Sequence, residues 1–519
     1  MMVAPFELAD LEGRRHRFPT GRATLLAFLK EDCPTCNTCA PLLETAHRAF
    51  GDTVAVLAVG QDEGNAALAE RHGFTFPVLD DAALRVSFAN EIETVPTLVL
   101  TSPQGEVQKR IVGFDREEWQ ELFVALAKLA DAVVPPVPWA DYPAFLPGCG
   151  SKSVEPGIYE RLQAEAEGSP IRARRIEIAV QDDEFEFMFD QGFTDGLPVV
   201  PPTAERVLRM LGGTRRDPQE VVAIVPPNMA PCTVEKVAIN AVMAGCKPEY
   251  LPVVITAVEA ACTDEFNAHG VMATTMGASP AVIVNGPIRN RIGMNAGLGA
   301  LGQGNRANAT IGRALRLVLR NVGGAKPGGT ERSTLGNPMK YTFCFAEWEE
   351  RSPWEPYHVE HGFRPEDSVV TLIALTGGPQ LIVDQTTRTA RAMAGSLALG
   401  VEAVGHPKSP AGDTLLVVCP EHVDTLWEQG MTKADLRQRI IEVTTRRLRD
   451  RLETEETGGG IPRRGFTEEQ LEAPAPKFRD PRNLHIVVAG GDAGKFSAVM
   501  AGWASGPGGS MPVSRRIQE

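Results

Sequence analysis

The stretch that decides the fold of the first part of the chain is 30-KEDCPTCNTCAPLLE-44. It places Cys33, Cys36 and Cys39 at intervals of three residues, directly after the apolar run TLLAFL of residues 24–29. The run is typical of a buried strand, and the residues after Cys39 carry apolar side chains at helical spacing. The cysteines therefore lie between a strand and the start of a helix, where free N–H groups and the helix dipole lower the pKa of a thiol.

This position predicts a different role for each thiol. Cys33 is the expected nucleophile, and Cys36, one turn further on, is the thiol that resolves a mixed disulfide. Cys39 has three interpretations that the sequence leaves open: a second resolving thiol, a third ligand for a soft metal, or a small packed side chain. A structural zinc site needs a fourth ligand, and none lies nearby in the sequence, so we expect no metal.

The segments after these cysteines continue an alternation of strands and helices. Residues 53–60 form a second apolar run, and residues 65–73 form a short helical pattern that ends at Gly73. Residues 94–114 predict two strands joined by the turn SPQG, and residues 116–132 predict an amphipathic helix. The order strand, CxxC, helix, strand, helix, strand, strand, helix is the order that a thioredoxin fold requires.

Residues 4–130 resemble a thioredoxin-like domain of the TlpA and peroxiredoxin-related type. APFELADLEGRRHRF of residues 4–18 resembles the opening strand segment of that family, and CPTC of residues 33–36 lies where its CxxC motif lies. TVPT of residues 94–97 resembles the loop that holds a cis-proline, here Pro96, beside the active cysteines. The resemblance implies a thioredoxin fold and a redox-active disulfide, with no other obligatory cofactor.

The residue before Cys33 departs from that family. The family usually has an aromatic residue there, whereas this chain has Asp32. A carboxylate beside a thiol disfavours a second negative charge, so we expect Asp32 to oppose formation of the Cys33 thiolate.

Length and composition limit what the rest of the chain does. A chain of 519 residues is too long for one core, so we expect several domains. The formal net charge of -14 argues against nucleic-acid binding, which needs a basic surface. No run approaches about eighteen apolar residues, and the start MMVAPFELADLEG lacks a basic region followed by an apolar one, so we expect neither a membrane span nor a secretory signal. Nine cysteines in a chain of this size do not make a disulfide scaffold, and a reducing, cytoplasmic location is expected.

The pattern predicts an α/β protein in which a thioredoxin fold is followed by a large multi-lobed α/β region. We place the thioredoxin-like domain at residues 1–132 and a proline-rich linker at residues 133–185. A substrate-binding α/β domain would occupy residues 186–365, and a second α/β lobe residues 366–519. The linker contains Cys149 in the sequence PGCGS, which indicates either an accessible loop thiol or a buried one.

A second thiol near a predicted helix start lies in the large region. Cys232 precedes a helical pattern, and Thr233 between them is a suitable cap. This position favours a thiolate that acts in catalysis or contacts a substrate, while a buried structural cysteine is the alternative. Glu235 and Lys236 follow within the first turn, where either would exchange protons with a bound substrate.

A glycine-rich run, residues 293–317, leads into a helix that begins near Asn305. Free N–H groups at this helix start suit a carboxylate, phosphate or other anion, and a tight turn with ordinary capping is the alternative. The side chains that would join this anion site are those of Asn295, Asn305, Arg306 and Arg313. Residues 487–500, VVAGGDAGKFSAVM, lack the full phosphate-loop motif, so we expect no nucleotide hydrolysis there. The glycine turn and Lys495 still indicate a site that binds an anion.

The large region also resembles a poorly characterised group of bacterial (seleno)proteins named for a UGSC motif. The resemblance depends on TDGLPVVPPT (194–203), EKVAINAVMAGCKPEYLPVV (235–254) and RANATIGRALRLVLRNVGG (306–324). This chain has CGSK at Cys149, which departs from a UGSC-type ending in cysteine. The resemblance implies thiol or selenol redox chemistry and names no substrate.

These observations predict a thiol-dependent oxidoreductase. Cys33 and Cys36 would supply reducing equivalents to a small-molecule site around Cys232, with Cys149 as a relay. The expected partners are a small-molecule substrate and an external thiol or thioredoxin-type reductant. The sequence leaves open whether the chain forms a homo-oligomer. One alternative is a lyase or transferase in which Cys232 attacks an electrophile and the thioredoxin-like domain regenerates it. Another is a redox sensor or soft-metal binder without turnover.

Overall fold

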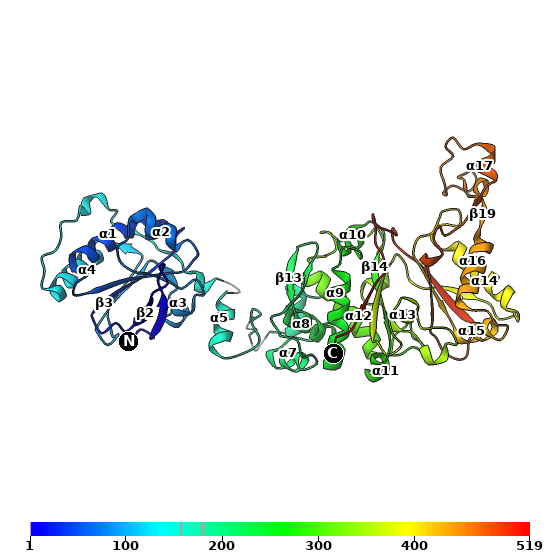
Figure 1. Cartoon of the computed structure of the whole chain (residues 1–519), viewed down its shortest axis with the longest axis horizontal. Coiled ribbons are helices and arrows are strands. Elements are labelled where there is room, and N and C mark those ends of the chain that lie inside the picture. Colours follow the sequence, from blue (N-terminus) through cyan, green and yellow to red (C-terminus); the bar gives the residue numbers. More distant parts are fainter. Residues whose placement is uncertain (1, 156–157, 177, 180–181, 519) are drawn as a thin grey trace. The chain divides into compact units, whose positions relative to one another are not determined.

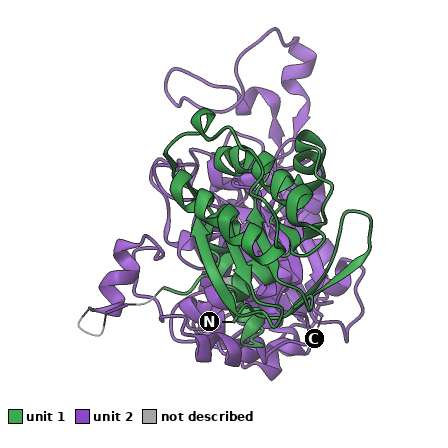
Figure 2. Ribbon diagram, turned by 90° about the vertical axis from the view of Figure 1, so that its left-hand side faces the viewer, with its two compact units in different colours: residues 1–176 green, residues 177–519 purple. Residues whose placement is uncertain are grey.

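The computed structural model describes residues 2–155, 158–176, 178–179 and 182–518. The chain forms two compact units, Met1–Ile176 and Glu177–Glu519, which Figure 2 colours separately. Within the described ranges, no helix is both long and apolar enough to cross a membrane.

The first unit is built around a five-stranded sheet with the strand order β5-β4-β3-β7-β8 (Figure 1). β3, β4 and β5 run parallel, whereas β7 and β8 are antiparallel to their neighbours. All side chains of β3, β4 and β7 are buried, as expected for the middle of a sheet that is covered on both faces. The five strands are β3 (Thr24–Leu29), β4 (Ala55–Gly60), β5 (Val78–Asp80), β7 (Thr97–Thr101) and β8 (Val107–Val112).

Helices and short strands complete this unit in the order that the sequence predicts. A single core joins the sheet to the long helix α1 and to α4, and it contains Cys33, Cys36 and Cys39. The predicted thioredoxin fold is confirmed. The remaining elements up to residue 130 are β1 (Phe6–Ala9), β2 (Arg15–Phe18), α1 (Pro34–Phe50), α2 (Asn65–His72), α3 (Arg85–Ala89), β6 (Thr94–Val95), β9 (Phe114–Asp115) and α4 (Arg116–Ala130).

The segment predicted as a linker, residues 133–185, differs from that expectation. Much of it belongs to the first unit, because Trp139 and Tyr142 pack on the thioredoxin core, with the ring of Trp139 5.5 Å from that of Phe123. Residues 156–157, 177 and 180–181 of the predicted linker lie outside the described residues. The elements of this segment are β10 (Phe145–Leu146), β11 (Cys149–Gly150), α5 (Ile158–Ala166) and α6 (Glu184–Asp190).

The second unit contains two four-stranded sheets, β15-β14-β16-β23 and β17-β22-β18-β21. Most neighbouring strands are antiparallel, but β14 is parallel to β15 and β18 is parallel to β21. The strands are β14 (Ser279–Asn285), β15 (Cys344–Ala346), β16 (Val369–Leu375), β17 (Gln380–Val383), β18 (Thr414–Val418), β21 (Leu484–Val488), β22 (Phe496–Ala501) and β23 (Val513–Arg516).

The two sheets share one apolar core, so the predicted lobes 186–365 and 366–519 are not separate bodies. Ile283 and Phe345 of the first sheet lie in the same cluster as Leu415 and Val487 of the second. The first sheet itself combines β14 and β15, from before the predicted boundary, with β16 and β23, from after it.

Helices α9 (Leu251–Ala261) and α12 (Arg306–Asn321) pack on the first sheet, and α8 (Val234–Ala244) packs on both of these helices (Figure 1). The core of the second sheet includes side chains of α14 (Ala390–Ala403), α15 (Pro420–Trp427) and α16 (Lys433–Thr444). Shorter elements are α7 (Ala204–Leu211), β12 (Val221–Val225), β13 (Ala230–Thr233), α10 (Ala268–Ala273), α11 (Ile288–Arg291), α13 (Tyr357–Glu360), β19 (Arg446–Arg447), α17 (Glu468–Glu472) and β20 (Pro474–Ala475).

Candidate redox site

Cys33 caps the N-terminus of α1. Its backbone is extended, and its sulfur accepts a hydrogen bond from the Cys36 N–H at 3.3 Å. Pro34 occupies the first helical position, where a missing N–H is harmless and the fixed φ suits a helix. The sequence CPTC thus builds its own helix start, with the thiol of Cys33 at the positive end of the helix dipole.

The hydrogen bonds at this helix start concentrate negative charge on one sulfur. The Cys36 thiol donates to Cys33 and lowers the pKa of Cys33 to about 5, and Cys149 adds further donors. Burial raises the pKa of Cys36, and the neighbouring Cys33 charge raises it further. The pKa of Cys39 is also raised, because its side chain is buried in the core. Cys33 is therefore the thiolate, and Cys36 keeps its proton.

Asp32 does not prevent the low pKa of Cys33, although the sequence predicts that its carboxylate opposes formation of the thiolate. Its side chain is 66% exposed, so water screens its charge, and it pairs with Lys30 at 3.3 Å. Water and Lys30 together account for a pKa of Cys33 that stays low beside a carboxylate.

A segment far along the chain covers Cys33. We call residues Tyr142–Val154 the strap. Within it, β11 pairs antiparallel with β6, so that Cys149 lies opposite Val95, directly before the cis peptide bond to Pro96. The Val95 carbonyl oxygen is 3.5 Å from Cys33 Sγ. The thiol and the backbone N–H of Cys149 both help to lower the pKa of Cys33.

The strap is fixed to the first unit on both sides of Cys149. Before it, the Thr35 hydroxyl donates to the Pro147 carbonyl at 2.7 Å. After it, the buried Ser151 accepts a hydrogen bond from Gln61 Nε2 at 2.8 Å, and the Ser153 hydroxyl donates to the Ile92 carbonyl at 2.8 Å. As a result Cys33 is 0% exposed, whereas Cys149 is half-buried.

Lys30 is a site residue that the sequence does not single out. It follows the strand before the cysteines, and its Nζ is 3.5 Å from the Gly150 carbonyl oxygen. Its positive charge lowers the pKa of Cys149, although burial and the neighbouring Cys33 raise that pKa overall. Lys30 therefore favours a negative charge on either of the facing sulfurs. It lies directly after β3 and three residues before Cys33, and no local motif marks it, because its contact is with the distant strap.

A thiolate at a helix start after a central strand, with a second thiol one turn on, defines a thioredoxin-like protein with a redox-active cysteine pair. The comparisons agree. Residues 2–110 match the AhpC/TSA family. The chain is 31% identical over 129 residues to "Thiol-disulfide oxidoreductase ResA" of Halalkalibacterium halodurans, which covers 24% of this chain and 73% of that protein. The chain belongs, through its first unit, to the AhpC/TSA family and is a thiol-disulfide oxidoreductase.

Two further relatives are similar to the same part of the chain. "Methylamine utilization protein MauD" of Paracoccus denitrificans is 28% identical over 127 residues, or 23% of this chain and 62% of that protein. The crystal structure of StoA from Bacillus subtilis is 25% identical, covers 23% of this chain and 97% of that chain, and has a TM-score of 0.21. The family match ends at residue 110, so the resemblance of the large region to UGSC-motif proteins stays a prediction.

Cys232 of the second unit lies directly before a helix that Thr233 caps, as the sequence predicts, but its thiol is buried. It is the third residue of β13, Thr233 is the N-cap of α8, and the Cys232 side chain is 0% exposed. Burial raises the pKa of Cys232 to about 12, which disfavours a nucleophilic thiolate. Glu235 is buried and accepts a hydrogen bond from Gln219, while Lys236 donates to the Pro231 carbonyl. This is the buried, structural alternative, and the arrangement lends no support to a lyase or transferase that uses Cys232.

The predicted anion-binding side chains serve internal contacts instead. Arg313 makes a bidentate pair with Asp195 at 2.7 and 2.9 Å, and Arg306 donates to the Gly245 carbonyl. Asn305 caps α12, as expected, and Asn295 closes a turn with Gly297 and Leu298. Lys495 lies 3.9 Å from Glu421. The structure does not bring these groups together around one cavity.

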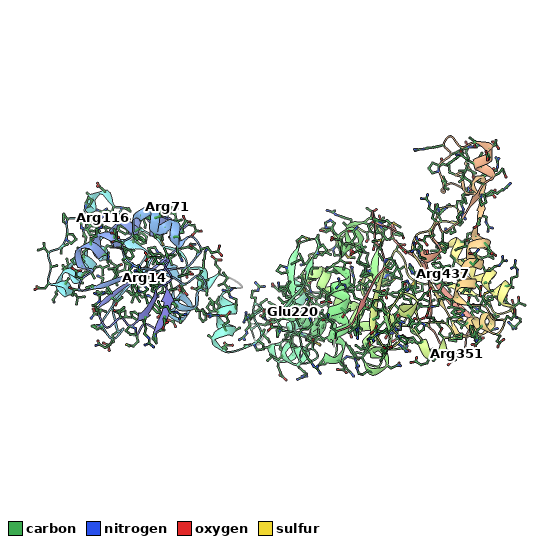
Figure 3. All side chains as sticks on the ribbon, in the orientation of Figure 1. Arg14, Arg71, Arg116, Glu220, Arg351 and Arg437 are labelled. Atoms are coloured by element: carbon green, nitrogen blue, oxygen red, sulfur yellow. The ribbon has the colours of Figure 1, made fainter. Side chains whose placement is uncertain are left out.

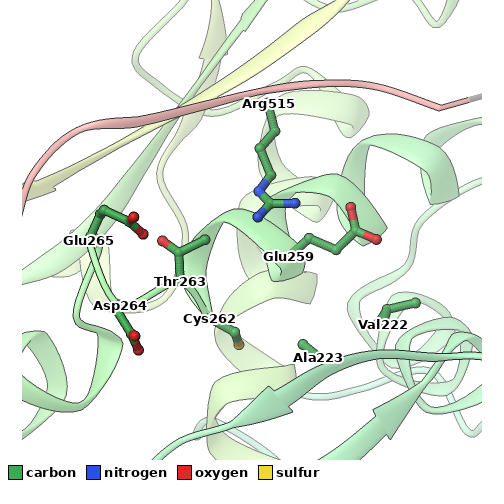
Figure 4. Close-up of a pocket in the computed structure, with 8 residues that line it drawn as sticks. All are labelled: Val222, Ala223, Glu259, Cys262, Thr263, Asp264, Glu265 and Arg515. Carbon is green, nitrogen blue, oxygen red and sulfur yellow. The ribbon is translucent and has the colours of Figure 1, made fainter.

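One cavity of the second unit, of about 420 Å³, is lined by a cysteine (Figure 4). Cys262 lies there beside Glu259, and Arg515 reaches in from β23. Burial raises the pKa of Cys262 to about 12, so this thiol is a weak nucleophile. A second cavity, of about 530 Å³, is lined by charged side chains that include Arg316, Glu331 and Lys340 and by no cysteine.

Proposed function

We propose that the Cys33–Cys36 pair exchanges disulfides with Cys149, a thiol of its own chain, and that Cys149 is the relay to the substrate. The observation that carries this proposal is the pairing of the strap with β6, which holds Cys149 against Cys33. Thiol-disulfide exchange requires such an approach of an attacking thiolate to a sulfur. An external disulfide meets the half-buried Cys149 first, because Cys33 has no exposed surface.

The proposed cycle conserves atoms and electrons. Cys149 passes its proton to the Cys33 sulfur and attacks a substrate disulfide as a thiolate, which forms a mixed disulfide. The substrate thiolate that leaves takes this proton from Cys33, so one substrate thiol is released and Cys33 is a thiolate again. The Cys33 thiolate then attacks the Cys149 sulfur and releases the second substrate thiol, which takes a proton from water. Cys36 next attacks Cys33 and passes its proton to the departing Cys149 sulfur, which leaves a Cys33–Cys36 disulfide. An external dithiol reduces that disulfide, so two electrons and two protons reach each substrate disulfide.

Lys30 assists the step in which Cys149 departs. While the Cys33–Cys149 disulfide exists, the negative charge of Cys33 no longer raises the pKa of Cys149. The charge of Lys30 then stabilises the departing Cys149 thiolate, and a more stable leaving thiolate departs faster.

The electron donor, the final acceptor, the compartment and the oligomeric state are part of the same proposal. The external donor would be a small dithiol or a thioredoxin-type protein in a reducing, cytoplasmic compartment. The final acceptor would be a small molecule bound by the second unit, reached through Cys149. A homo-oligomer is compatible with this cycle and is not required by it.

Turnover of a small disulfide tests the proposal. The whole chain, with dithiothreitol as donor and hydroxyethyl disulfide as acceptor, should lose all catalysed turnover in Cys33→Ser. Cys149→Ser should lower turnover at least about tenfold, because the covered Cys33 must then meet the substrate directly. Cys232→Ala is the matched control, a buried thiol whose loss should leave turnover unchanged. Full turnover in a folded Cys149→Ser chain would overturn the relay.

A further inference from the structure

A cysteine, a histidine and a serine meet in the second sheet of the second unit. Cys419 directly follows β18 and Gly490 follows β21 two residues after that strand ends. Because β18 and β21 are parallel, their carboxyl ends meet at one edge, which is where α/β proteins commonly place their sites. Cys419 is also the N-cap of α15, and Ser497 reaches the same point from β22.

The hydrogen bonds orient His422 as a base toward the thiol. Its Nε2 lies 3.0 Å from the Asp384 carbonyl oxygen, which only accepts, so Nε2 carries the proton of the neutral ring. Its Nδ1 is therefore the acceptor, and it receives a hydrogen bond from the Ser497 hydroxyl at 2.7 Å. The Ser497 hydroxyl also lies 3.7 Å from Cys419 Sγ, so it links the thiol to the base. A nucleophile, a base and a group that orients the base are the parts of an activated thiol.

The two glycine-rich segments of the sequence come together beside this thiol. A Cβ on Gly490 would lie 3.7 Å from the Cys419 Cβ, and a Cβ on Gly491 would lie 3.0 Å from Leu298. The Gly490 N–H also donates to the Ala296 carbonyl at 2.9 Å. The backbone of Gly490 therefore lies beside Cys419, and its φ of +121° is a conformation that favours glycine.

Charged groups around the cluster are already paired. Arg351, labelled in Figure 3, bridges Asp424 of α15 and Asp492 of the glycine turn, each at 2.7 Å. Glu421 accepts from the Gly494 N–H and lies 3.9 Å from Lys495. These pairs leave little net charge to attract an ion, and Cys419 is only 3% exposed, so the arrangement suits a small, uncharged reactant.

We propose that Cys419 is a second nucleophilic thiol of this chain, with His422 as its base, and that it takes a small neutral carbon electrophile. The thiol proton passes to the Ser497 hydroxyl, which gives its own proton to His422 Nδ1, and a bond forms between Cys419 Sγ and the electrophilic carbon. With a carbonyl compound, the C=O π electrons move to oxygen, which takes the proton back from His422, so a hemithioacetal forms. This site is independent of the Cys33–Cys149 cycle.

The titration of the two groups agrees with this geometry. Burial opposes a thiolate at Cys419, but the hydrogen bond and charge of His422 outweigh it and lower the pKa of Cys419. The pKa of His422 is raised in turn by its bond to Cys419, against the effect of burial.

Alkylation of the whole chain by iodoacetamide, read by peptide mass spectrometry, tests the site. In this probe reaction the S–C bond forms, the C–I bond breaks and iodide leaves. We expect Cys419 to be labelled at least about tenfold faster at pH 6 than Cys246 and Cys344, which are buried without a histidine partner. His422→Gln should slow labelling of Cys419 about a hundredfold, the usual effect of removing a base.

The result that overturns the proposal is labelling of Cys419 no faster than that of Cys246 and Cys344. Equal labelling of Cys419 in the wild-type chain and a folded His422→Gln chain would overturn it as well. If His422→Gln unfolds, the pH profile of the wild-type chain decides, because an activated Cys419 is labelled half-maximally below the ordinary thiol pKa of about 8.5. A midpoint at or above that value would contradict the activation.

Discussion

The charge at the redox site lies on one sulfur because its neighbours act as donors. Cys36 supplies both a backbone N–H and a thiol to Cys33, and Cys149 supplies the same two groups from the opposite side. Burial keeps Cys36 and Cys149 protonated, since their pKa values are raised. The result is a thiolate that is ready to attack and two thiols that hold protons for the leaving groups.

Removal of these donors should raise the pKa of Cys33 in a graded way. Its pKa of about 5 should rise toward the ordinary value of about 8.5 in Cys36→Ala, because the Cys36 thiol is the main donor, and less far in Cys149→Ala. The thiolate of the reduced chain absorbs in the ultraviolet, so its titration measures this without any reagent that must reach Cys33. Cys33→Ser provides the baseline to subtract.

The sign of the accompanying stability change follows from the same shift. A lowered pKa means that the Cys33 thiolate stabilises the reduced fold above the ordinary thiol pKa, and this contribution is lost as pH falls through about 5. A Cys33 titration at an ordinary thiol pKa in the wild-type chain would contradict the assignment of the thiolate.

Spacing predicts some of these residues and not others. Cys33 and Cys36 belong to one local motif, and the sequence also predicts the helix that begins there. Lys30 and Gln61 act through contacts to the strap, which is distant in sequence, and no local pattern reports them. For Cys232 the sequence predicts the helix start and its cap Thr233 correctly, but it does not reveal the burial that raises the pKa of this thiol, because burial depends on segments distant in sequence.

At the scale of elements, the strap controls access to the redox site. Its two short strands, β10 and β11, extend β9 and β6, and they are held by short backbone pairings and by partly buried side chains such as Leu146. Contacts of this kind open locally more readily than a packed core does. The strap is therefore the element whose opening sets how fast external reagents reach Cys33.

Gly148→Ala should loosen the strap. A Cβ on Gly148 would lie 2.8 Å from the Val95 carbonyl oxygen and closer still to Thr94 Cγ2, so the strap must shift away from β6. Overpacking of this kind typically costs about 1–3 kcal/mol, which corresponds to an open population larger by about five- to 150-fold. Alkylation of Cys33 by iodoacetamide, measured by peptide mass spectrometry, should accelerate by a similar factor.

Gly150→Ala is the matched control for that substitution. Gly150 lies in the strap two residues after Gly148, but its Cβ would meet nothing within 4 Å. Alkylation of Cys33 should therefore keep the wild-type rate. Equal acceleration by both substitutions, or by neither, would mean that the strap does not limit access to Cys33.

The element order of the first unit follows from the sequence, but the strap does not. Apolar runs and helical spacing predict β3, α1, β4 and the later elements of the sheet. The proline-rich segment reads as a linker because prolines prevent regular structure, whereas Trp139 and Tyr142 anchor it to the core. The sequence also does not reveal which strands of residues 186–519 are neighbours, because each sheet there pairs strands that are distant in sequence.

At the scale of the whole molecule, a thiol pair and its partner thiol belong to one chain. A tethered partner replaces a bimolecular encounter with an intramolecular one, and so raises the effective concentration of the thiol that Cys33 meets. The nine cysteines divide accordingly. Cys33, Cys36 and Cys149 form one hydrogen-bonded group, Cys419 has a histidine partner, and the pKa values of the others are raised by burial.

The most direct test of the account is a disulfide map of the Cys36→Ser chain. Without the resolving thiol, the Cys33–Cys149 disulfide should accumulate after the reduced protein is mixed with one equivalent of hydroxyethyl disulfide. Proteolysis under non-reducing conditions and mass spectrometry should then find the peptide of Cys33 joined to that of Cys149, and should find no such species in a Cys36→Ser, Cys149→Ser chain. Cys33 joined to the probe thiol while Cys149 stays free for alkylation would contradict the account.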